Sequence, residues 1–331
     1  MRADRVRRFA VLVLFNVWCG VAAGDAERAV CGLEAACRTG DRAVILREVG
    51  ALKEAWGRNP DFDLIVRVAG DRAADPTLRW VMIDSLVVYK RDVRTRKEAA
   101  ALLDLLDGVS WDACQHPAVR AKALTVGGGM LALFIEKGIA SEARRVSFST
   151  RLASLIESER NEELLAAACI TAGRAGAREA VPALRRHLLD EERQAIVRRT
   201  AAGSLGLLKD RGSIPLLAGV LDGTEDRGLF GAAAYSLGTI GGEEVLGPLV
   251  EHADRAGGSS CRNALRRNTE TIGRVLRDPD SPHLAQAARA AGLSDMREAL
   301  PALRAFEADP RPDVRAAARD ARAALRGEAR P

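Results

Sequence analysis

The sequence predicts an all-α fold, a right-handed solenoid of stacked helix–turn–helix repeats. A glycine followed nine or ten residues later by a proline occurs four times, and three of these prolines are spaced 33 residues apart. A fixed period of this length is typical of stacked repeats. Leucines at helical spacing follow the prolines, which indicates one buried face on each second helix. The four pairs are Gly173 and Pro182, Gly206 and Pro215, Gly238 and Pro248, and Gly292 and Pro301.

Each repeat is expected to consist of a first helix, a short polar turn and a second helix. The residues before each glycine are small and apolar, and glycine adopts the left-handed backbone that ends many helices, so we expect it to end the first helix. The proline is expected to open the second helix, where the missing N–H has no intrahelical partner. Leu205 and Leu237 each precede a repeat glycine. We expect both to be buried between helices of neighbouring repeats.

A second recurring string contains an aliphatic residue followed by arginine, in most copies two residues after a proline. It ends at Arg79, Arg120 and Arg315, and a copy without the proline ends at Arg198. The helix dipole disfavours a cation near the start of a helix by about 0.3–1 kcal/mol. We therefore expect Arg198 to bond to a carboxylate, Asp190 or Asp222, or to a free carbonyl at the end of an adjacent helix.

Together these elements resemble HEAT-like repeats of the short bacterial type, which also occur in phycobilin lyases. The resemblance covers residues 161–251 and 281–326 and is faint from about 70 to 130. A 33-residue period would also fit ankyrin or tetratricopeptide repeats, but their characteristic motifs are absent from the sequence. The resemblance implies a scaffold only. It assigns no lyase residue to a position in this chain.

Three regions follow from these patterns. Residues 1–24 are expected to be a signal peptide. Residues 25–160 are expected to form a divergent helical region, made of degenerate repeats or acting as a terminal cap. Residues 161–331 are expected to form the repeat domain, with an inserted helix at about 255–280. Within the divergent region, apolar residues at helical spacing predict helices at 41–57, 63–70, 76–90, 95–107 and 117–135.

The N-terminus predicts export. Arginines precede an apolar run over residues 9–23, and small residues then precede Asp25, which is typical of a cleaved signal peptide. The run is shorter than the roughly 20 residues that span a bilayer, so we expect no stable membrane insertion. Cys19 follows bulky and polar residues, and we do not expect it to carry a lipid anchor. The mature chain is therefore expected to be periplasmic or secreted.

The charge of the mature chain argues against a nucleic-acid partner. Removing residues 1–24 takes away four arginines and one aspartate, which lowers the formal net charge from +5 to +2. Nucleic-acid binders carry a strong basic footprint that such a chain lacks. Cys31 and Cys37 are close in sequence, and an oxidising compartment leaves open whether they form a disulfide. Cys169 lies among alanines and is expected to be a buried, unreactive thiol.

We find no sequence motif for catalysis, and we expect no catalytic residue, cofactor or metal site. The nucleophile motifs and the zinc motif of metalloproteases are absent. Residues 127–129 are three consecutive glycines without the lysine of a phosphate-binding loop, and we interpret them as a site of close helix packing or of a kink. The four histidines are scattered. Only Cys114 and His116 bring two ligand types close together in sequence.

Two functional hypotheses remain. The first is an exported non-enzymatic scaffold or protein–protein interaction module that binds a protein or peptide through a solenoid groove. The second is an enzyme or enzyme-associated subunit whose site is assembled from dispersed residues. Converging titratable groups in a pocket would favour the second. Positions three and four residues after the repeat prolines give a candidate interaction surface of Arg185, Arg186, Glu251, His252 and Arg304.

Overall fold

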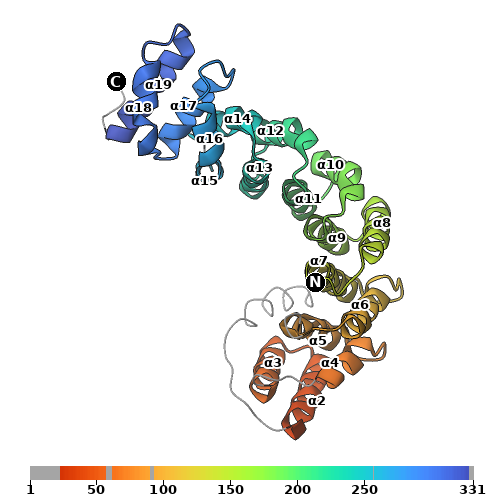
Figure 1. The fold of residues 1–331 in the computed structure, drawn as a ribbon. Helices are drawn as coiled ribbons and strands as arrows, with labels where there is room; N and C mark the ends of the chain where they lie inside the picture. Colours follow the sequence, from red (N-terminus) through yellow and green to blue (C-terminus); the bar gives the residue numbers. More distant parts are fainter. Residues whose placement is uncertain (1–22, 57–61, 90–92, 256, 328–331) are drawn as a thin grey trace. The chain divides into compact units, whose positions relative to one another are not determined.

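A computed structural model describes residues 23–56, 62–89, 93–255 and 257–327, and the regular secondary structure of these residues is entirely helical (Figure 1). The predicted all-α repeat fold is confirmed. The chain forms two compact units that divide between Arg145 and Val146, before the expected boundary at residue 160. The predicted signal peptide, with Cys19, lies outside the described residues except for Ala23 and Gly24, which begin the first described helix.

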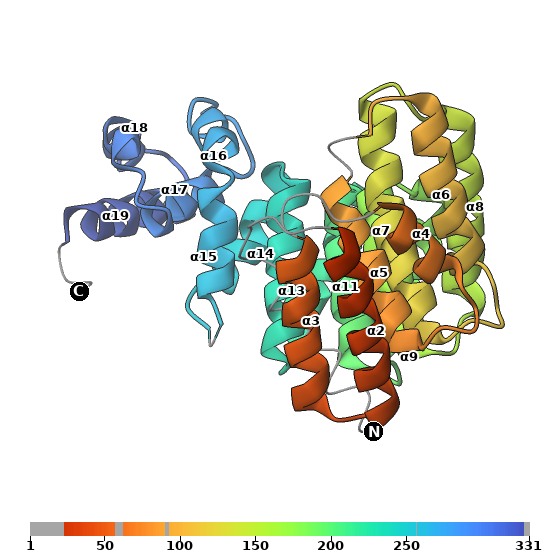
Figure 2. The same ribbon diagram turned by 90° about the horizontal axis from the view of Figure 1, so that it is seen from below.

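The first unit contains six helices among its described residues. Helix α2 packs against α3, α4 against α5, and α7 against both α5 and α6, and Figure 2 shows α2 beside α3. Five of the six match the predicted segments to within three residues, whereas the one that begins at Ala23 was not predicted. The helices are α2 (Ala23–Thr39), α3 (Arg42–Trp56), α4 (Phe62–Gly70), α5 (Pro76–Tyr89), α6 (Arg96–Ser110) and α7 (Pro117–Glu136).

Helix α7 is the apolar centre of the first unit. It is long and apolar enough to cross a membrane by length and composition, and most of its apolar stretch is buried inside the unit. The three consecutive glycines lie within this helix. A β-carbon on Gly127 would come within 3.3 Å of the Leu106 β-carbon on α6. Gly127 therefore allows close helix packing, one of the two expected roles, whereas a β-carbon on Gly129 would meet no atom within 4 Å.

The second unit consists of paired helices stacked in two layers. The first helices α9, α11 and α13 lie side by side, and the second helices α10, α12 and α14 form the other layer (Figure 1). The unit contains most of α8 (Glu142–Ser158), followed by α9 (Glu162–Ala175), α10 (Val181–Leu189), α11 (Ala195–Leu207), α12 (Ile214–Gly223), α13 (Arg227–Ile240), α14 (Leu246–Glu251), α15 (Ser259–Arg266), α16 (Thr269–Val275), α17 (Leu284–Leu293), α18 (Leu300–Phe306) and α19 (Pro312–Arg326).

Prolines open the second helices as predicted. Pro182, Pro215 and Pro301 are the second residues of α10, α12 and α18, and each follows a short 3₁₀ turn. Pro248 is instead the third residue of α14, which ends after only six residues. Counting positions from this proline therefore does not give the same place in the helix as in the other repeats.

The expectation that the repeat glycines end the first helices was wrong. Gly206 lies inside α11 with an ordinary helical backbone, and a β-carbon there would come within 2.7 Å of the Ser236 α-carbon on α13. The glycine is needed because two helix backbones approach closely at this point. The other glycines make equivalent approaches: Gly173 to Ser204, Gly238 to Ala264, and Gly292 to Ala321.

Side-chain hydrogen bonds link the first helices at the same level. The Ser204 hydroxyl donates to the Cys169 carbonyl oxygen at 2.6 Å, and the Ser236 hydroxyl donates to the Ala202 carbonyl oxygen at 2.8 Å. These bonds tie α11 to α9 and α13 to α11. Leu205 lies beside this contact and is fully buried, as is its equivalent Leu237, which confirms the predicted repeat register.

The segment predicted as one inserted helix at 255–280 is a shortened repeat of two helices, α15 and α16. The chain turns at Asn268, whose side-chain amide donates to the Gly238 carbonyl oxygen at 3.0 Å and to the Ala264 carbonyl oxygen at 2.9 Å. Ala264 packs against Gly238 as Ser236 packs against Gly206. The apolar spacing continued through the turn, so the sequence pattern did not reveal it.

The structure excludes a Cys31–Cys37 disulfide. Both residues lie on α2 as free thiols. Six residues along a helix separate two α-carbons by about 9 Å, which is longer than the ~7 Å that a disulfide can span. Burial raises the pKa of the Cys37 thiol to about 12 and that of the Cys261 thiol to about 11. Cys169 is fully buried, as predicted, and burial raises its pKa to about 12.

Thiol alkylation should follow this pattern of exposure. In the native protein at mildly alkaline pH, iodoacetamide is expected to modify the exposed Cys31 and Cys114 and to spare Cys169, because the thiolate is the nucleophile and burial suppresses it. Peptide mass spectrometry measures the modification at each site. Concentrated urea should abolish the difference. Alkylation of native Cys169 as fast as Cys114 would contradict the packing described here.

Candidate interaction surface

Three of the four arginines of the recurring string bond to a carbonyl at or near the end of a preceding helix, whereas Arg315 donates to the Asp309 and Pro310 carbonyl oxygens in the turn before its own helix. The Arg198 side chain donates through Nε to the Leu188 carbonyl oxygen at 3.1 Å, near the end of α10. The expected bond to a free carbonyl of an adjacent helix is therefore confirmed. The carboxylates that we considered as alternative partners lie elsewhere: Asp190 faces Arg193 and Asp222 faces His252.

The same bond occurs in the first unit. Arg79 donates through Nε to the Ala69 carbonyl oxygen at 3.0 Å, and Arg120 donates to the Ser110 carbonyl oxygen at 3.1 Å. In both cases the acceptor lies ten residues before the arginine, as it does for Arg198. The recurring string is thus a structural element that the two units share.

Substitution of Arg198 should weaken the fold. The change Arg198→Ala is expected to lower the free energy of unfolding by about 1–3 kcal/mol, because the partly buried Leu188 carbonyl loses its charged donor. Urea denaturation followed by circular dichroism measures this loss. Arg174→Ala, at the exposed end of α9, is the control and should change stability little. An Arg198→Ala protein as stable as wild type would show that water replaces the arginine without cost.

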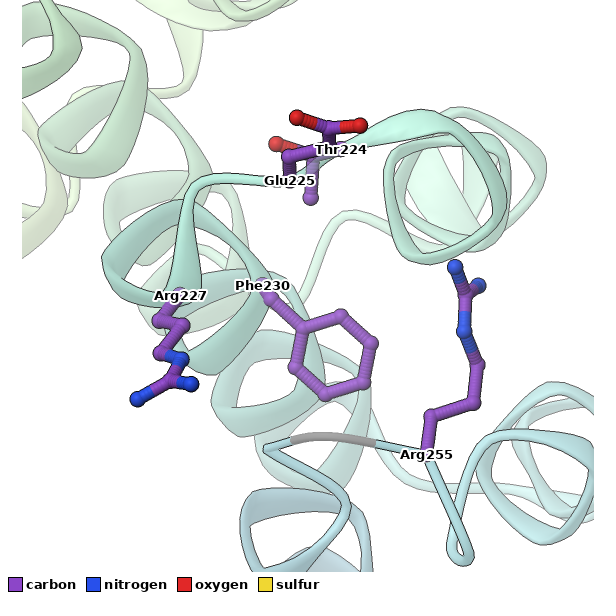
Figure 3. A pocket seen from close by; sticks show the side chains of 5 residues that line it. All are labelled: Thr224, Glu225, Arg227, Phe230 and Arg255. Atoms are coloured by element: carbon purple, nitrogen blue, oxygen red, sulfur yellow. The ribbon is translucent and has the colours of Figure 1, made fainter.

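The repeat formed by α13 and α14 has no arginine at this position, and the end of the preceding α12 is closed differently. Phe230 on α13 stands eight residues before Gly238, as Arg198 stands eight residues before Gly206. Arg255, from the turn after α14, instead donates to the Leu221 carbonyl oxygen at 2.7 Å, near the end of α12. Figure 3 shows Phe230 and Arg255 on opposite sides of the resulting depression of about 300 Å³.

The first two residues of the predicted surface, Arg185 and Arg186, form ion pairs with other helices of the stack. Arg185 on α10 pairs with Asp210 at 2.7 Å, and Arg186 pairs with Glu157 on α8 at 2.8 Å. The hydrogen bond from Arg186 holds the pKa of Glu157 below its usual value. These two arginines therefore connect repeats through intramolecular pairs.

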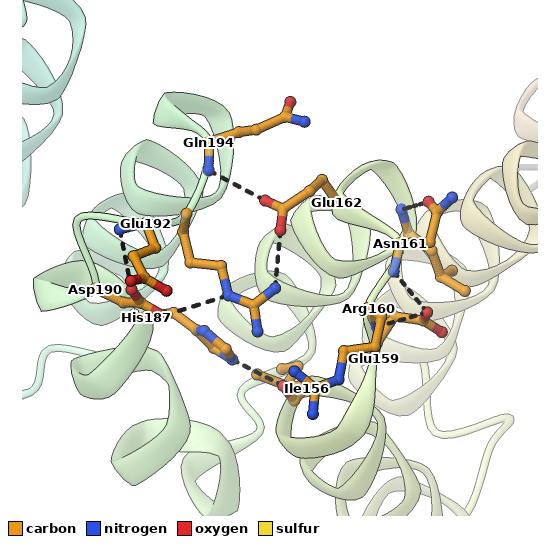
Figure 4. Close-up of polar contacts among 11 residues, drawn as sticks. Ile156, Glu159, Arg160, Asn161, Glu162, His187, Asp190, Glu192 and Gln194 are labelled. Carbon is orange, nitrogen blue, oxygen red and sulfur yellow. Dashed lines mark hydrogen bonds and ion pairs between the residues drawn. The ribbon is translucent and has the colours of Figure 1, made fainter.

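Carboxylates at helix starts take part in the same network. Glu162, in the first turn of α9, pairs with Arg193 at 2.8 Å and accepts from the Gln194 backbone amide at 3.2 Å (Figure 4). Asp226 caps α13 and binds Arg199 at 2.8 Å. The Arg199 hydrogen bond, together with the capped backbone amides, lowers the pKa of Asp226. These contacts join α9 to the start of α11, and α11 to α13.

His252 does not belong to the exposed surface, which corrects the prediction. Its side chain is buried, with Nδ1 2.8 Å from the Pro248 carbonyl oxygen and Nε2 3.0 Å from the Asp222 carboxylate. Helix α14 ends at Glu251, so the next residue turns inward instead of continuing along the helix face. Glu251 and Arg304 are exposed as predicted.

Glu251 lies at the edge of a second depression, of about 430 Å³, which three helices of the second unit form. The close approach of Gly292 and Ala321 brings α17 and α19 together here. The charged side chains Arg289 on α17 and Asp320 on α19 were not predicted. The prediction used positions after the repeat prolines, which lie on second helices, whereas α17 and α19 are first helices. The lining consists of Val250, Glu251, Asp254, Arg289, Gly292, Leu293, Asp320, Ala321 and Ala324.

The second depression is lined by charged side chains of both signs. Glu251, Arg289 and Asp320 are exposed and have no ion-pair partner among the described residues. In the part of the chain that the structure describes, no three His, Cys, Asp or Glu side chains are grouped so that they could hold a metal ion.

Comparison with known families supports the repeat register. The family model for HEAT repeats matches residues 149–229 and 188–270. Residues 149–270 form HEAT repeats. The matched residues include α9 to α14 and α15, so the shortened pair α15 and α16 begins within the HEAT-repeat region. The second depression lies largely beyond it, where α17 and α19 repeat the close glycine approach of the matched HEAT repeats.

Solved structures with similarity to the chain are distant. YibA of Escherichia coli is 14% identical, with 80% of this chain and 92% of YibA covered and a TM-score of 0.44. Human deoxyhypusine hydroxylase, solved with glycerol, is 16% identical, with 81% and 96% covered and a TM-score of 0.32. Neither similarity assigns an activity to these HEAT repeats. No curated protein matches the sequence.

Proposed function

We propose that the chain is an exported, non-enzymatic scaffold that binds a protein or peptide partner at the second depression, between α14, α17 and α19. The HEAT repeats provide a helical scaffold. The observation that carries the proposal is a depression lined by exposed charges of both signs that have no ion-pair partner among the described residues. Arg185 and Arg186 are committed to pairs between repeats, whereas Glu251, Arg289 and Asp320 face a depression without such pairs.

The titratable groups favour binding over catalysis. The lowered carboxyl pKa values arise from helix caps, turns and arginine contacts. One example is Asp309, whose pKa the Arg311 side chain and backbone amide lower to about 2. The buried thiols of Cys169 and Cys261 have raised pKa values, which makes them poor nucleophiles. An enzyme assembled from dispersed residues would need shifted groups that converge on a pocket. The lowered carboxyl groups named here instead take part in ion pairs, helix caps and turns.

The export part of the proposal rests on residues 1–24. A charged start, a short apolar run and small residues before Asp25 form the expected signal. Edman sequencing of the protein from its native source should give a chain that lacks about two dozen N-terminal residues. An intact Met1 in that material would contradict export by this signal.

Binding at the depression is testable by site-specific crosslinking. The mature chain, residues 25–331, carries the photoreactive residue benzoylphenylalanine in place of Ala324, which is exposed and lines the depression. It is irradiated in the native extracytoplasmic fraction. A discrete protein adduct is expected. The control carries the same residue in place of Leu207, which is 45% exposed on α11 and distant in sequence from the depression. Equal adducts at both positions, or none at Ala324, would overturn the proposal.

A further inference from the structure

We propose that the second depression receives a cationic side chain, lysine or arginine, that a protein partner presents beside an apolar residue. This inference rests on the proposed function, because it specifies the chemistry of the partner at the same surface. The occupant follows from the shape of the depression and from the balance of its unpaired charges.

The depression is shaped for side chains rather than for a large ligand. Its volume of about 430 Å³ lies at the lower end of the range for ligand pockets. Gly292 packs against Ala321 at the junction of α17 and α19, which leaves the floor without large side chains. Val250, Leu293 and Ala324 add apolar surface around it. A long side chain with an aliphatic stem fits such a floor, because lysine and arginine bury their methylene groups along apolar surface.

The charge balance of the depression selects a cation. Two carboxylates, Glu251 on α14 and Asp320 on α19, are unpaired among the described residues, against one unpaired guanidinium, Arg289. Asp254 adds a third carboxylate, which lies 3.5 Å from Arg262. The local balance is therefore negative on a mature chain whose formal charge is positive. An entering lysine or arginine would gain two carboxylate partners.

Arg289 indicates a second property of the partner, namely hydrogen-bond acceptors beside the cation. Its guanidinium lines the same depression, three residues before Gly292 on α17. A peptide that places a cation near Glu251 and Asp320 also brings backbone carbonyl oxygens into the depression. Arg289 can donate to such oxygens, since its guanidinium has five N–H groups and no acceptor.

Other occupants fit less well. A nucleic acid or another polyanion would face the Glu251 and Asp320 carboxylates. A purely apolar ligand would remove three charged side chains from water without a partner, which is costly. A metal ion would need a closer group of ligands than these carboxylates form. The depression around Phe230 lacks the same bias, because it is lined by Arg227 and Arg255 with a single acidic residue, Glu225.

Defined peptides test the inference with the mature chain. Fluorescein-labelled pentapeptides of sequence Ala-Leu-Xaa-Leu-Ala carry arginine, glutamine or glutamate at Xaa, and fluorescence anisotropy measures their binding. The arginine peptide is expected to bind about tenfold more tightly than the glutamate peptide, which corresponds to two partly exposed ion pairs. Added salt should reduce the preference. Equal binding of the three peptides, or no binding of the arginine peptide, would overturn the inference.

Matched variants locate the preference. The double change Glu251→Gln and Asp320→Asn is expected to remove the preference for arginine. The control, Glu270→Gln with Glu298→Gln, removes two exposed carboxylates that do not line the depression and should preserve it. Circular dichroism verifies that both proteins are folded. An arginine preference that survives the first pair of changes would place the cation elsewhere.

The two experiments separate this inference from the proposed function. A partner that crosslinks at position 324, together with pentapeptides that show no charge preference, would retain the binding surface and reject the cationic side chain. Failure of the crosslink would reject the surface itself, whatever the peptides show.

Discussion

Replacing Leu205 with alanine is expected to lower the free energy of unfolding by about 2–5 kcal/mol. Leu205 is fully buried on α11, which packs against α9 on one side and α13 on the other. The change removes three carbon atoms and leaves a cavity. The close backbone contact at the neighbouring Gly206 limits how far the helices can move to fill that cavity. Urea denaturation followed by circular dichroism measures the loss.

A control on the same helix separates the effect of burial on stability from the effect of helix propensity. Leu207 lies two residues further along α11 and is 45% exposed. Leu207→Ala should change the free energy of unfolding little, because the surface is already in contact with water and alanine favours helix. Equal losses for Leu205→Ala and Leu207→Ala would show that the repeat register described here is incorrect.

Replacing Gly206 with alanine is expected to destabilise the protein by about 1–3 kcal/mol, although alanine is the better helix former. The new β-carbon would come within 2.7 Å of the Ser236 α-carbon, so the backbone of α13 must move away from α11. That movement also lengthens the bond from the Ser236 hydroxyl to the Ala202 carbonyl oxygen. Thermal and urea denaturation measure the effect.

The matched control for this change is Gly203→Ala on the same helix. A β-carbon on Gly203 would meet no atom within 4 Å, so alanine there should stabilise the protein by about 0.5–1 kcal/mol through reduced backbone entropy of the unfolded chain. Opposite signs at the two glycines are the expected result. Destabilisation of the same size at both would mean that helix contact does not explain the glycine at position 206.

Sequence periodicity predicted the helices of both units wherever apolar residues formed a broad stripe. Helix α8 was not predicted, because only Phe148, Ser149, Leu152 and Ile156 are buried on it and its apolar stripe is narrow. Helix α2 was not predicted either, although the signal-peptide interpretation covered only its first two residues. The turn at Asn268 was not predicted because the apolar positions on either side of it keep a helical spacing.

The role of the repeat glycines could not be decided from local sequence. A glycine near the end of an alanine-rich segment fits a terminal left-handed residue and a close helix contact equally well. The residue that decides between them, Ser236 for Gly206, lies 30 residues further along the chain. Local patterns carry no information about which backbone will lie opposite.

The candidate surface was predicted in part for a similar reason. Equivalent positions after the prolines gave Glu251, which lines the second depression, but also His252, which is buried beyond the early end of α14. Arg289 and Asp320 come from first helices, and only the stacking of α14, α17 and α19 brings them near Glu251. A count along one layer of helices cannot find a surface that both layers form.

Phe230 stands on α13 where α11 carries Arg198, and as a result the end of α12 depends on a contact from further along the chain than the end of α10 does. The end of α10 is held by Arg198, only ten residues further along the chain, so that closure forms within its own helical hairpin. The end of α12 is held by Arg255, 34 residues further along, after the whole of α13 and α14. Opening of the turn after α14 would therefore release α12 as well, whereas α10 would keep its closure. In hydrogen-exchange terms, α12 and α14 should open as one cooperative segment.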